Sequence, residues 1–553
     1  MRFVAFSLAL SALVVMAPGA DAATTTGRLL VSLRPEARGT AHAAAAHAVI
    51  ARAGARTSGS AVPQIGLVVA RPGPGESLRA LARRLRADPH VRAVDAERRA
   101  TLRLVPNDPA LSVPETAPGT PPNTPVEWWP AREDFPRAWD FTTGTGALVG
   151  VIDTGVDATH PDLASKVKAA DDFDSQTRHG PATTDDVGHG THVASIACAA
   201  AGNGIGVAGA GYDCGLIIEK SDLTDASVAR SIVSATDQGA DAINMSFGTD
   251  GRTAPPPAIL DAIDYAYDHG VVLVAAASDD DVDEQGDPAN VLQPGGTGSD
   301  LSAGKGLTVT AATANDRRAS YAGFGSEISM AAYGTLDEHI GPGGLLGAFP
   351  QQTSEIERGT ILPPSPPCAC RTRFQGDDRY AYLQGTSMAA PQVAATGALI
   401  RHLNPDLPAA RILRLLKETA RRPAGTGWTP DLGWGILNAG AAVEAARNVD
   451  MRAPTSTVRA PASTTGRSIV LRLHGADAAP PGVVASGVAK FRVYRSIDGG
   501  RPVRFITTTR TRLRVSARRR AGYAFYVQAV DRAGNVQPFP ARPGARTRVL
   551  RRR

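Results

Sequence analysis

Residues 148–155 read LVGVIDTG, a short apolar run that ends in a carboxylate and a glycine turn. The run does not alternate with polar residues, which is typical of a strand buried on both faces. Three more runs of this kind occur at 215–218, 242–245 and 271–276, and helical stretches lie at 189–199, 259–268 and 387–402. This alternation predicts an α/β fold in which helices cover a parallel sheet.

Three motifs at the ends of these elements carry reactive residues. Asp153 closes the first strand, His189 opens a helix within GHGTHVA (188–194), and Ser387 opens another within GTSMAAP (385–391). Asp before His before Ser is one of the known chain orders for a catalytic triad. Alone, each residue has a plainer explanation as a turn residue, a structural histidine or a helix cap. Together they indicate nucleophilic catalysis.

The chemistry requires these three residue types. A serine hydroxyl is a weak nucleophile until a base takes its proton during attack. Histidine suits that role because its pKa lies near neutrality. A buried carboxylate fixes the histidine tautomer and stabilises the imidazolium that forms.

The chain from residue 107 to 447 resembles the subtilisin-like serine peptidases. The resemblance rests on DTG (153–155), HPD (160–162), the His189 motif, NMSFG (244–248) and the Ser387 motif. It implies an α/β fold with a central parallel sheet, endopeptidase activity on protein or peptide substrates, and a triad of Asp153, His189 and Ser387. His192 would be a motif residue without a chemical step.

The same resemblance implies a substrate-binding cleft. An edge strand that pairs with the substrate backbone would be formed by Ser246, Phe247 and Gly248. The pocket for the side chain before the scissile bond would be walled by Ala275, Ala276, Ala277 and Ser278.

The sequence departs from the family at the oxyanion hole. Most members have an asparagine where this chain has Asp279, and the asparagine amide donates a hydrogen bond to the tetrahedral intermediate. An ionised carboxylate has no proton to donate, whereas a protonated one has. One branch of the family also carries Asp here, and the backbone N–H of Ser387 remains as a second donor. The alternative is an alignment shifted by one or two residues, with another group as donor.

A structural Ca²⁺ site is also implied by the resemblance. Its ligands would be the carboxylate of Asp162, the side chain of Asn203, and the carbonyls of Ala201, Ile205 and Val207. Oxygen ligands on a flexible loop suit Ca²⁺. The alternative is a glycine-rich turn without metal.

The N-terminal part predicts a secreted precursor. Residues 1–22 have the charge, apolar stretch and small residues of a signal peptide, and Pro18 and Asp21 make the stretch too short for a membrane anchor. Residues 23–105 predict a small α+β unit that resembles the family's inhibitory propeptide. A Pro-rich segment, 104–130, predicts an exposed connector, with self-cleavage expected between residues 100 and 128.

The C-terminal part differs in composition from the rest of the chain. The peptidase domain is expected over 106–448, with a surface insertion at about 335–380, and period-two strands over 455–553 predict an all-β sandwich. Residues 451–553 contain 22 Lys and Arg against 3 Asp and Glu, a net charge of +19 that leaves −13 for the rest.

Such a charge favours binding to anionic cell-surface polymers, chiefly through residues 518–520 and 551–553, although a merely well-solvated surface is the alternative.

Four cysteines allow three disulfide pairings. Cys198 with Cys214 is favoured because the two bracket a glycine-rich loop, while Cys368 and Cys370 would close a strained ring. A zinc site is the weaker alternative, because no second CxC motif or suitably spaced His pair accompanies them.

Length and composition leave the function class open. The chain has 553 residues, 43% of them hydrophobic and 20% charged, which suits a soluble protein of two to four folded units. Two other functions remain at this point. One is a non-catalytic or catalytically weakened binding protein on a peptidase scaffold, and the other is a narrow processing enzyme whose insertion restricts the cleft.

Overall fold

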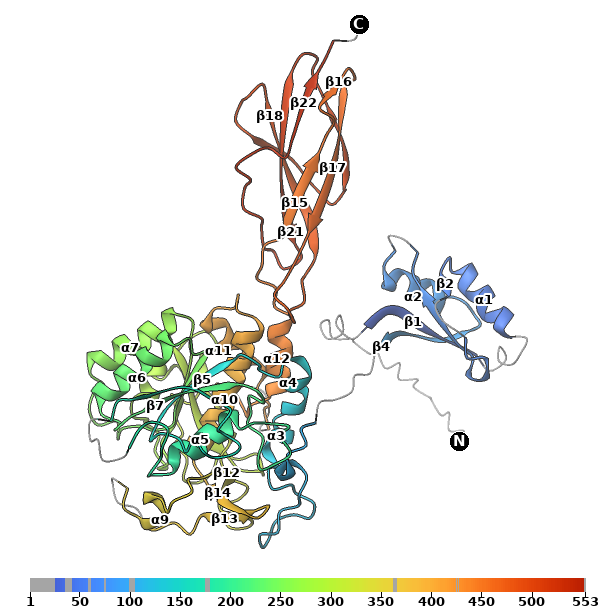
Figure 1. The fold of residues 1–553 in the computed structure, drawn as a ribbon. Helices are drawn as coiled ribbons and strands as arrows, with labels where there is room; N and C mark the ends of the chain where they lie inside the picture. Colours follow the sequence, from blue (N-terminus) through green and yellow to red (C-terminus); the bar gives the residue numbers. More distant parts are fainter. Residues whose placement is uncertain are drawn as a thin grey trace, which may run out of the picture. The chain divides into compact units, whose positions relative to one another are not determined.

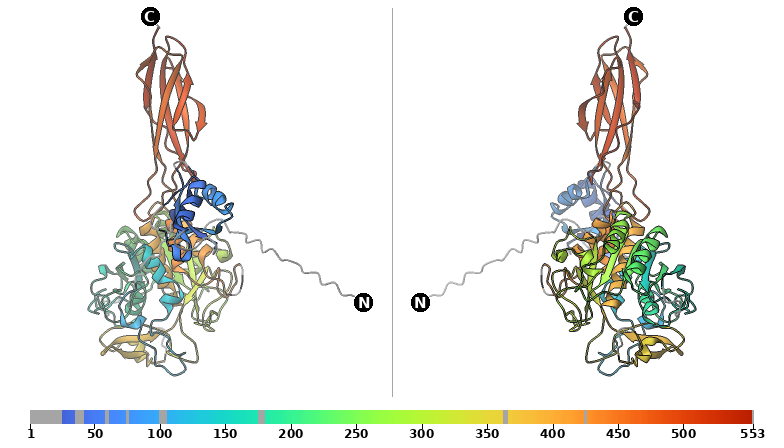
Figure 2. Two further views of the ribbon diagram at one scale, coloured as in Figure 1. Left: turned by 90° about the vertical axis from the view of Figure 1, so that its right-hand side faces the viewer. Right: turned by 90° about the vertical axis from the view of Figure 1, so that its left-hand side faces the viewer.

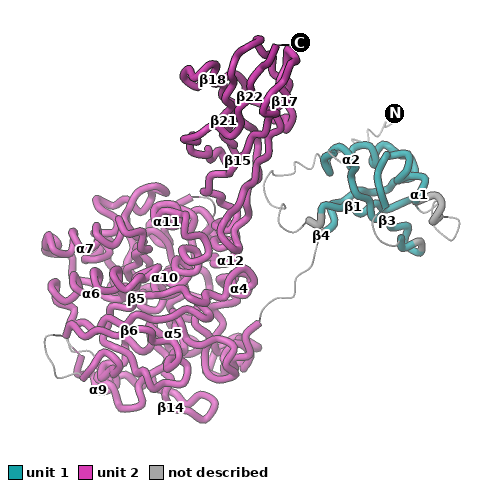
Figure 3. Tube along the Cα trace, turned by 45° about the horizontal axis from the view of Figure 1, so that its top comes forward, with its two compact units in different colours: residues 1–102 teal, residues 103–553 magenta. Residues whose placement is uncertain are grey.

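The structure is a computed structural model that describes residues 25–34, 42–57, 61–73, 76–98, 105–174, 180–361, 366–423, 425 and 427–551. The chain divides into two compact units, residues 1–102 and 103–553 (Figure 3). The predicted signal peptide lies outside the described residues. Among the helices that are described, none has the length and apolar character needed to cross a membrane.

The first unit is a four-stranded sheet with two helices. Its strand order is β2-β3-β1-β4, formed by β1 (Thr25–Leu33), β2 (Arg56–Thr57), β3 (Leu67–Arg71) and β4 (Val91–Arg98). The helices are α1 (His42–Arg52) and α2 (Leu78–Arg86), and Ser77 caps α2 by accepting a hydrogen bond from the N–H of Ala80. The unit is therefore a small α+β fold, as the sequence predicts, while its propeptide role stays a prediction.

A seven-stranded parallel sheet forms the centre of the second unit (Figure 1). Its strand order is β11-β10-β9-β8-β5-β7-β6. The strands are β5 (Leu148–Asp153), β6 (Val167–Asp172), β7 (Gly215–Lys220), β8 (Ala242–Met245), β9 (Val272–Ala276), β10 (Gly306–Ala312) and β11 (Met330–Tyr333). All six pairings are parallel, which confirms the predicted fold class.

Helices cover both faces of this sheet (Figure 1). One face packs against α6 (Asp225–Asp237) and α7 (Pro257–Asp268). The other packs against α5 (His189–Cys198), α10 (Thr386–Leu403), α11 (Ala409–Thr419) and α12 (Ala439–Arg447). Because side chains are buried on both faces, the strands carry apolar residues at nearly every position.

Two segments are less exposed than the sequence suggests. The connector is exposed only in its middle, because Asp108, Ala110, Trp128 and Trp129 at its ends are buried against the peptidase fold. The expected insertion contains a three-stranded sheet in the order β12-β14-β13, formed by β12 (Leu345–Ala348), β13 (Arg371–Phe374) and β14 (Asp377–Leu383). Strand β12 is buried. In both segments a few buried apolar residues lie among many Pro and Gly residues, so amino-acid composition alone does not predict that these parts are buried.

The C-terminal region forms two facing β-sheets (Figures 1 and 2). The smaller contains β15 (Thr455–Arg459), β17 (Ser468–Ala476) and β20 (Arg512–Ser516). The larger contains β16 (Ser463–Thr464), β18 (Val488–Ile497), β19 (Val503–Thr508), β21 (Gly522–Asp531) and β22 (Ala545–Val549). Side chains from both sheets share one core, which is the arrangement of a sandwich.

The favoured disulfide is present. Cys198 and Cys214 are bonded, 16 positions apart in sequence and with 5.5 Å between their Cα atoms. Cys368 and Cys370 are bonded as well, so no cysteine is available for the alternative zinc site.

Candidate active site

Asp153 and His189 meet at the carboxyl end of β5. Asp153 is the last residue of that strand and is 3% exposed, while His189 is the first residue of α5. Nδ1 of His189 lies 2.8 Å from Oδ1 of Asp153 and 3.0 Å from Oδ2. The contact holds the imidazole with Nδ1 towards the carboxylate, which leaves Nε2 for a reacting group.

The electrostatic surroundings of His189 favour its protonated form. Burial by itself lowers the pKa of this imidazole, but the charge and hydrogen bond of Asp153 outweigh that effect. The charges of Asp185 and Asp279 contribute in the same direction, and the resulting pKa lies above the usual value. The site can therefore stabilise an imidazolium, which is what a general base becomes after it accepts a proton.

A second buried carboxylate, which sequence reasoning missed, positions the start of α5. Oδ1 of Asp185 accepts the N–H of Gly188 at 2.8 Å, and Oδ2 accepts both the N–H and the hydroxyl of Thr191. Oδ1 also accepts the hydroxyl of Thr154, beside the end of β5. The sequence offered little signal, because an Asp four residues before the histidine looks like an ordinary loop residue.

Ser387 lies at the start of α10 and contacts the segment that follows β8. Its Oγ donates to the carbonyl of Ser246 at 3.2 Å, and the hydroxyl of Ser246 donates back to the carbonyl of Ser387 at 3.0 Å. Within the described residues, no hydrogen bond joins Ser387 to His189. Catalytic hydrogen bonds are often formed only when substrate is bound, so this arrangement is compatible with a nucleophile that rotates towards its base.

Asp279 lies next to Ser387, at the position the sequence assigns to the oxyanion hole. Its Oδ1 accepts the N–H of Thr386 at 2.7 Å and the hydroxyl of Thr386 at 2.8 Å. Desolvation raises the pKa of Asp279, and the two bonds from Thr386 partly offset the increase. Part of the residue is nevertheless exposed to solvent. The hydroxyl of Tyr321 is buried, and burial together with the charge of Asp279 raises its pKa.

The residues predicted to bind substrate line up beside these groups. Ser246, Phe247 and Gly248 directly follow β8, and Ala275 and Ala276 end β9. Of the other two, Ala277 accepts the hydroxyl of Thr386 through its carbonyl, and the N–H of Ser278 donates to the buried side chain of Gln285.

Of the predicted calcium ligands, the structure brings Asp162 and the side chain of Asn203 into contact. Asp162 is fully buried, and its carboxylate accepts hydrogen bonds from Nδ2 of Asn203 and the N–H of Val207. A Cβ on Gly206 would lie 1.9 Å from Oδ2 of Asp162, so only glycine leaves this space open. Burial raises the pKa of Asp162 to about 6.

Asp108 lies at the same loop as Asp162, although no sequence motif singles it out. It is 1% exposed, its Oδ2 accepts the N–H of Gly202, and its buried Oδ1 has no hydrogen-bond partner. Asp108 and Asp162 bind adjacent residues of one loop, Gly202 and Asn203, and after burial the charge of Asp108 also raises the pKa of Asp162. A buried oxygen without a partner beside a second carboxylate fits a hard cation with oxygen ligands. In the sequence, Asp108 looks like a turn residue before a proline.

His192 is structural, as the sequence suggested. It is fully buried, and its Nε2–H donates to the carbonyls of Leu345 and Ala381, both at 3.1 Å. Burial lowers its pKa to about 4. The imidazole is therefore neutral at ordinary pH and ties α5 to the strands of the expected insertion.

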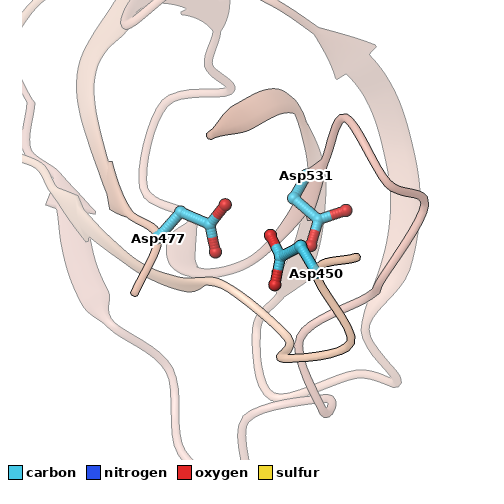
Figure 4. Close-up of side chains that lie close together, drawn as sticks. All are labelled: Asp450, Asp477 and Asp531. Carbon is cyan, nitrogen blue, oxygen red and sulfur yellow. The ribbon is translucent and has the colours of Figure 1, made fainter. Parts of the chain in front are cut away.

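Three carboxylates also gather near the start of the C-terminal region (Figure 4). One oxygen each of Asp450, Asp477 and Asp531 lies within 4.8 Å of the others. Backbone amides already bind them: Ser486 donates to Asp450 at 2.7 Å, and Gly487 donates to Asp477 at 2.6 Å. The trio thus joins the chain after α12 to two loops of the β-region by hydrogen bonds.

An α/β fold with an Asp–His pair at a strand end and a serine at a nearby helix start is typical of a serine hydrolase. A profile of the Subtilase family, Peptidase S8, matches residues 144–435. Thermitase of Thermoactinomyces vulgaris is 30% identical over 320 residues, which cover 55% of this chain and 94% of thermitase. The extracellular protease of Xanthomonas campestris pv. campestris is 32% identical over 410 residues, which cover 66% of this chain and 62% of that protein.

Among solved structures, a protease of Pseudoalteromonas arctica is 29% identical and covers 62% of this chain and 99% of that chain, with a TM-score of 0.47. The family match covers more than half of this chain. The chain belongs to the subtilase family and is a serine-type endopeptidase.

Proposed function

We propose that this endopeptidase works through Asp153, His189 and Ser387 and forms an acyl-enzyme. The observation that carries the proposal is the 2.8 Å contact between Asp153 and His189 beside a serine at the start of α10. As Ser387 Oγ attacks the scissile carbonyl carbon, His189 takes the hydroxyl proton and Asp153 stabilises the imidazolium. The carbon–nitrogen bond then breaks, and His189 gives the proton to the leaving amine. Water, deprotonated by His189, releases the acyl group.

Hydrolysis of a peptide library by single-residue variants tests this proposal. Ser387→Ala should lower kcat by about 10⁶, the size of the effect in a subtilisin of the same family. Asp153→Asn should lower it by about 10⁴, because the imidazole then adopts the wrong tautomer. His269→Ala and Ser326→Ala, at exposed positions away from the site, serve as matched controls with unchanged rates. Full hydrolysis by the Ser387→Ala variant would exclude this triad.

The alternative is a protein with little catalysis that acts mainly in surface binding. The position of Asp279 favours this alternative, because an ionised carboxylate beside Ser387 would repel the negative oxygen of the tetrahedral intermediate. The same library experiment separates the two functions. Turnover by the wild-type enzyme favours the peptidase, and very low turnover favours surface binding.

We also propose that Ca²⁺ stabilises the fold at the buried carboxylates. The carboxylates of Asp108 and Asp162 and the side chain of Asn203 would hold it, together with backbone carbonyls of Ala201, Ile205 and Val207. When bound, the ion would neutralise two buried negative charges and tie the loop after α5 to the start of the domain. Calorimetry with and without EGTA tests this, and an unchanged melting temperature would exclude the site.

Finally, we propose that residues 23–105 are a propeptide that inhibits the enzyme and is removed by self-cleavage after secretion. Its support is the separate compact unit over residues 1–102 and the similarity to an extracellular protease. Residues 108–111 lie on the peptidase side of the boundary, because Asp108 accepts the N–H of Gly202 and the N–H of Ala110 donates to the carbonyl of Gly206. Cleavage is therefore expected at the beginning of the predicted window, between residues 100 and 105.

A further inference from the structure

A row of three arginines crosses the outer face of the sheet β15-β17-β20. Arg459 on β15 is paired directly with Arg472 on β17, and Arg472 is paired directly with Arg512 on β20. All three residues are exposed, whereas their neighbours Leu471 and Leu513 are buried in the sandwich core. Because directly paired residues share a face, the three side chains point to solvent on the same side.

Further basic residues extend the row along the strands. Arg514 lies two residues after Arg512 and is exposed on the same face, opposite Val470. His474 lies two residues after Arg472, also exposed, opposite Thr457. We call Arg459, Arg472, Arg512 and Arg514 the arginine face.

The arginine face lacks counter-charges. Across the part of the chain that the structure describes, none of its four side chains makes an ion pair or hydrogen bond. The three carboxylates of residues 451–553 are engaged elsewhere: Asp477 and Asp531 belong to the trio, and Asp498 accepts the N–H of Gly522. Like charges directly opposite on adjacent strands destabilise a sheet. An anionic ligand that bridges the row would remove that repulsion.

We propose that the arginine face binds a linear anionic polysaccharide. Adjacent strands place the three paired arginines about 4.8 Å apart, so the row offers a regular series of planar guanidinium groups for carboxylate, sulfate or phosphate substituents. No Phe, Tyr or Trp lies among the paired positions of this face, which carries Thr455, Thr457, Ser468, Val470, His474, Ala476 and Ser516 besides its arginines. The face therefore lacks the stacking platforms on which proteins bind single-stranded nucleic acid. This binding does not depend on the proposed catalytic mechanism.

The proposal differs from a general effect of net charge, and the chain provides a matched control. Residues 518–520, the contacts favoured by sequence, are three exposed arginines outside the row. The test compares Arg459→Gln/Arg472→Gln/Arg512→Gln with Arg518→Gln/Arg519→Gln/Arg520→Gln, each made in the full chain carrying Ser387→Ala to prevent self-digestion. Both triple variants lose the same charge, so they differ only in where it is lost.

Affinity for heparin, used as the probe, is measured at physiological salt by calorimetry. The triple variant of the paired arginines (the row variant) should bind heparin at least about tenfold more weakly than the Ser387→Ala parent, which is the loss expected for even one charge-assisted contact. The triple variant of residues 518–520 should stay within about threefold of the parent. The row variant should also melt at or above the parent temperature without ligand, because repulsion has been removed. Equal losses in both variants, or tighter binding of single-stranded DNA than of heparin, would overturn the proposal.

Discussion

Replacing Asp279 with asparagine should increase catalysis at neutral pH. The asparagine keeps an oxygen that can accept both hydrogen bonds from Thr386, so the local structure is retained. It adds an N–H donor beside Ser387, where the negative oxygen develops. One oxyanion donor is worth about 10²–10³ in kcat, a magnitude that comes from a subtilisin of this same family. Asp279→Asn should therefore raise kcat by on the order of 10².

The pH profile gives a second, independent readout of the same change. The charge of Asp279 is one of the causes that raise the pKa of His189, so its removal should lower that pKa. The acid limb of kcat/KM then moves to lower pH, because His189 becomes a free base at lower pH. In the wild type, catalysis needs Asp279 protonated, which low pH favours, and His189 neutral, which high pH favours. The variant removes that conflict.

Steady-state kinetics across pH on one peptide substrate measures both effects. Asp280→Asn is the matched control, because it removes a neighbouring exposed charge without placing an amide beside Ser387. A gain specific to Asp279→Asn supports the oxyanion position. A variant no faster than wild type at any pH, or an equal gain in the control, would show that Asp279 does not occupy the oxyanion position.

Three further predictions concern stability and maturation. Burial raises the pKa of Asp162 from 3.8 to about 6, so metal-free stability is lost as pH rises through that range, and EGTA should lower the melting temperature more at about pH 7.5 than at about pH 4.5. Asp108→Asn should shrink that difference; an equal EGTA effect at both pH values would contradict the site. Removing the Cys198–Cys214 disulfide as a double alanine variant should lower the free energy of unfolding by about 3 kcal/mol, measured by urea titration with reduced wild type as control. Ser387→Ala should accumulate as an unprocessed precursor in a peptidase-deficient host, and N-terminal sequencing that finds a mature form there would contradict self-cleavage.

Much of the fold could be predicted because its strands carry a strong local signal. Residues 148–152, 242–245 and 271–276 are apolar runs buried on both faces, and all of them form strands of the central sheet. The β-region was also predictable from its period-two pattern. The buried ends of the connector were not, since their anchors are single residues whose partners lie far along the chain, as with Ala110 and Gly206.

In the candidate active site, too, residues within local sequence motifs could be predicted, whereas residues that depend on distant partners could not. Asp153, His189 and Ser387 stand inside extended motifs, and the structure brings Asp153 and His189 into contact. Asp185 and Asp108 have no motif of their own, and their roles depend on backbone amides that only the folded chain brings near them. The arginine face likewise depends on strand register, which pairs Arg459 with a residue 13 positions away. Charge counting revealed the basic region but not this row.

The identity of the nucleophile is tested most directly by covalent labelling of the mature enzyme with a fluorophosphonate, followed by digestion and mass spectrometry. An activated serine reacts with this reagent because a neighbouring base takes its proton. The account predicts one modified residue, Ser387, with labelling that is lost in His189→Ala and retained in His269→Ala. Labelling at another residue, or no labelling of an enzyme that still hydrolyses peptides, would contradict it.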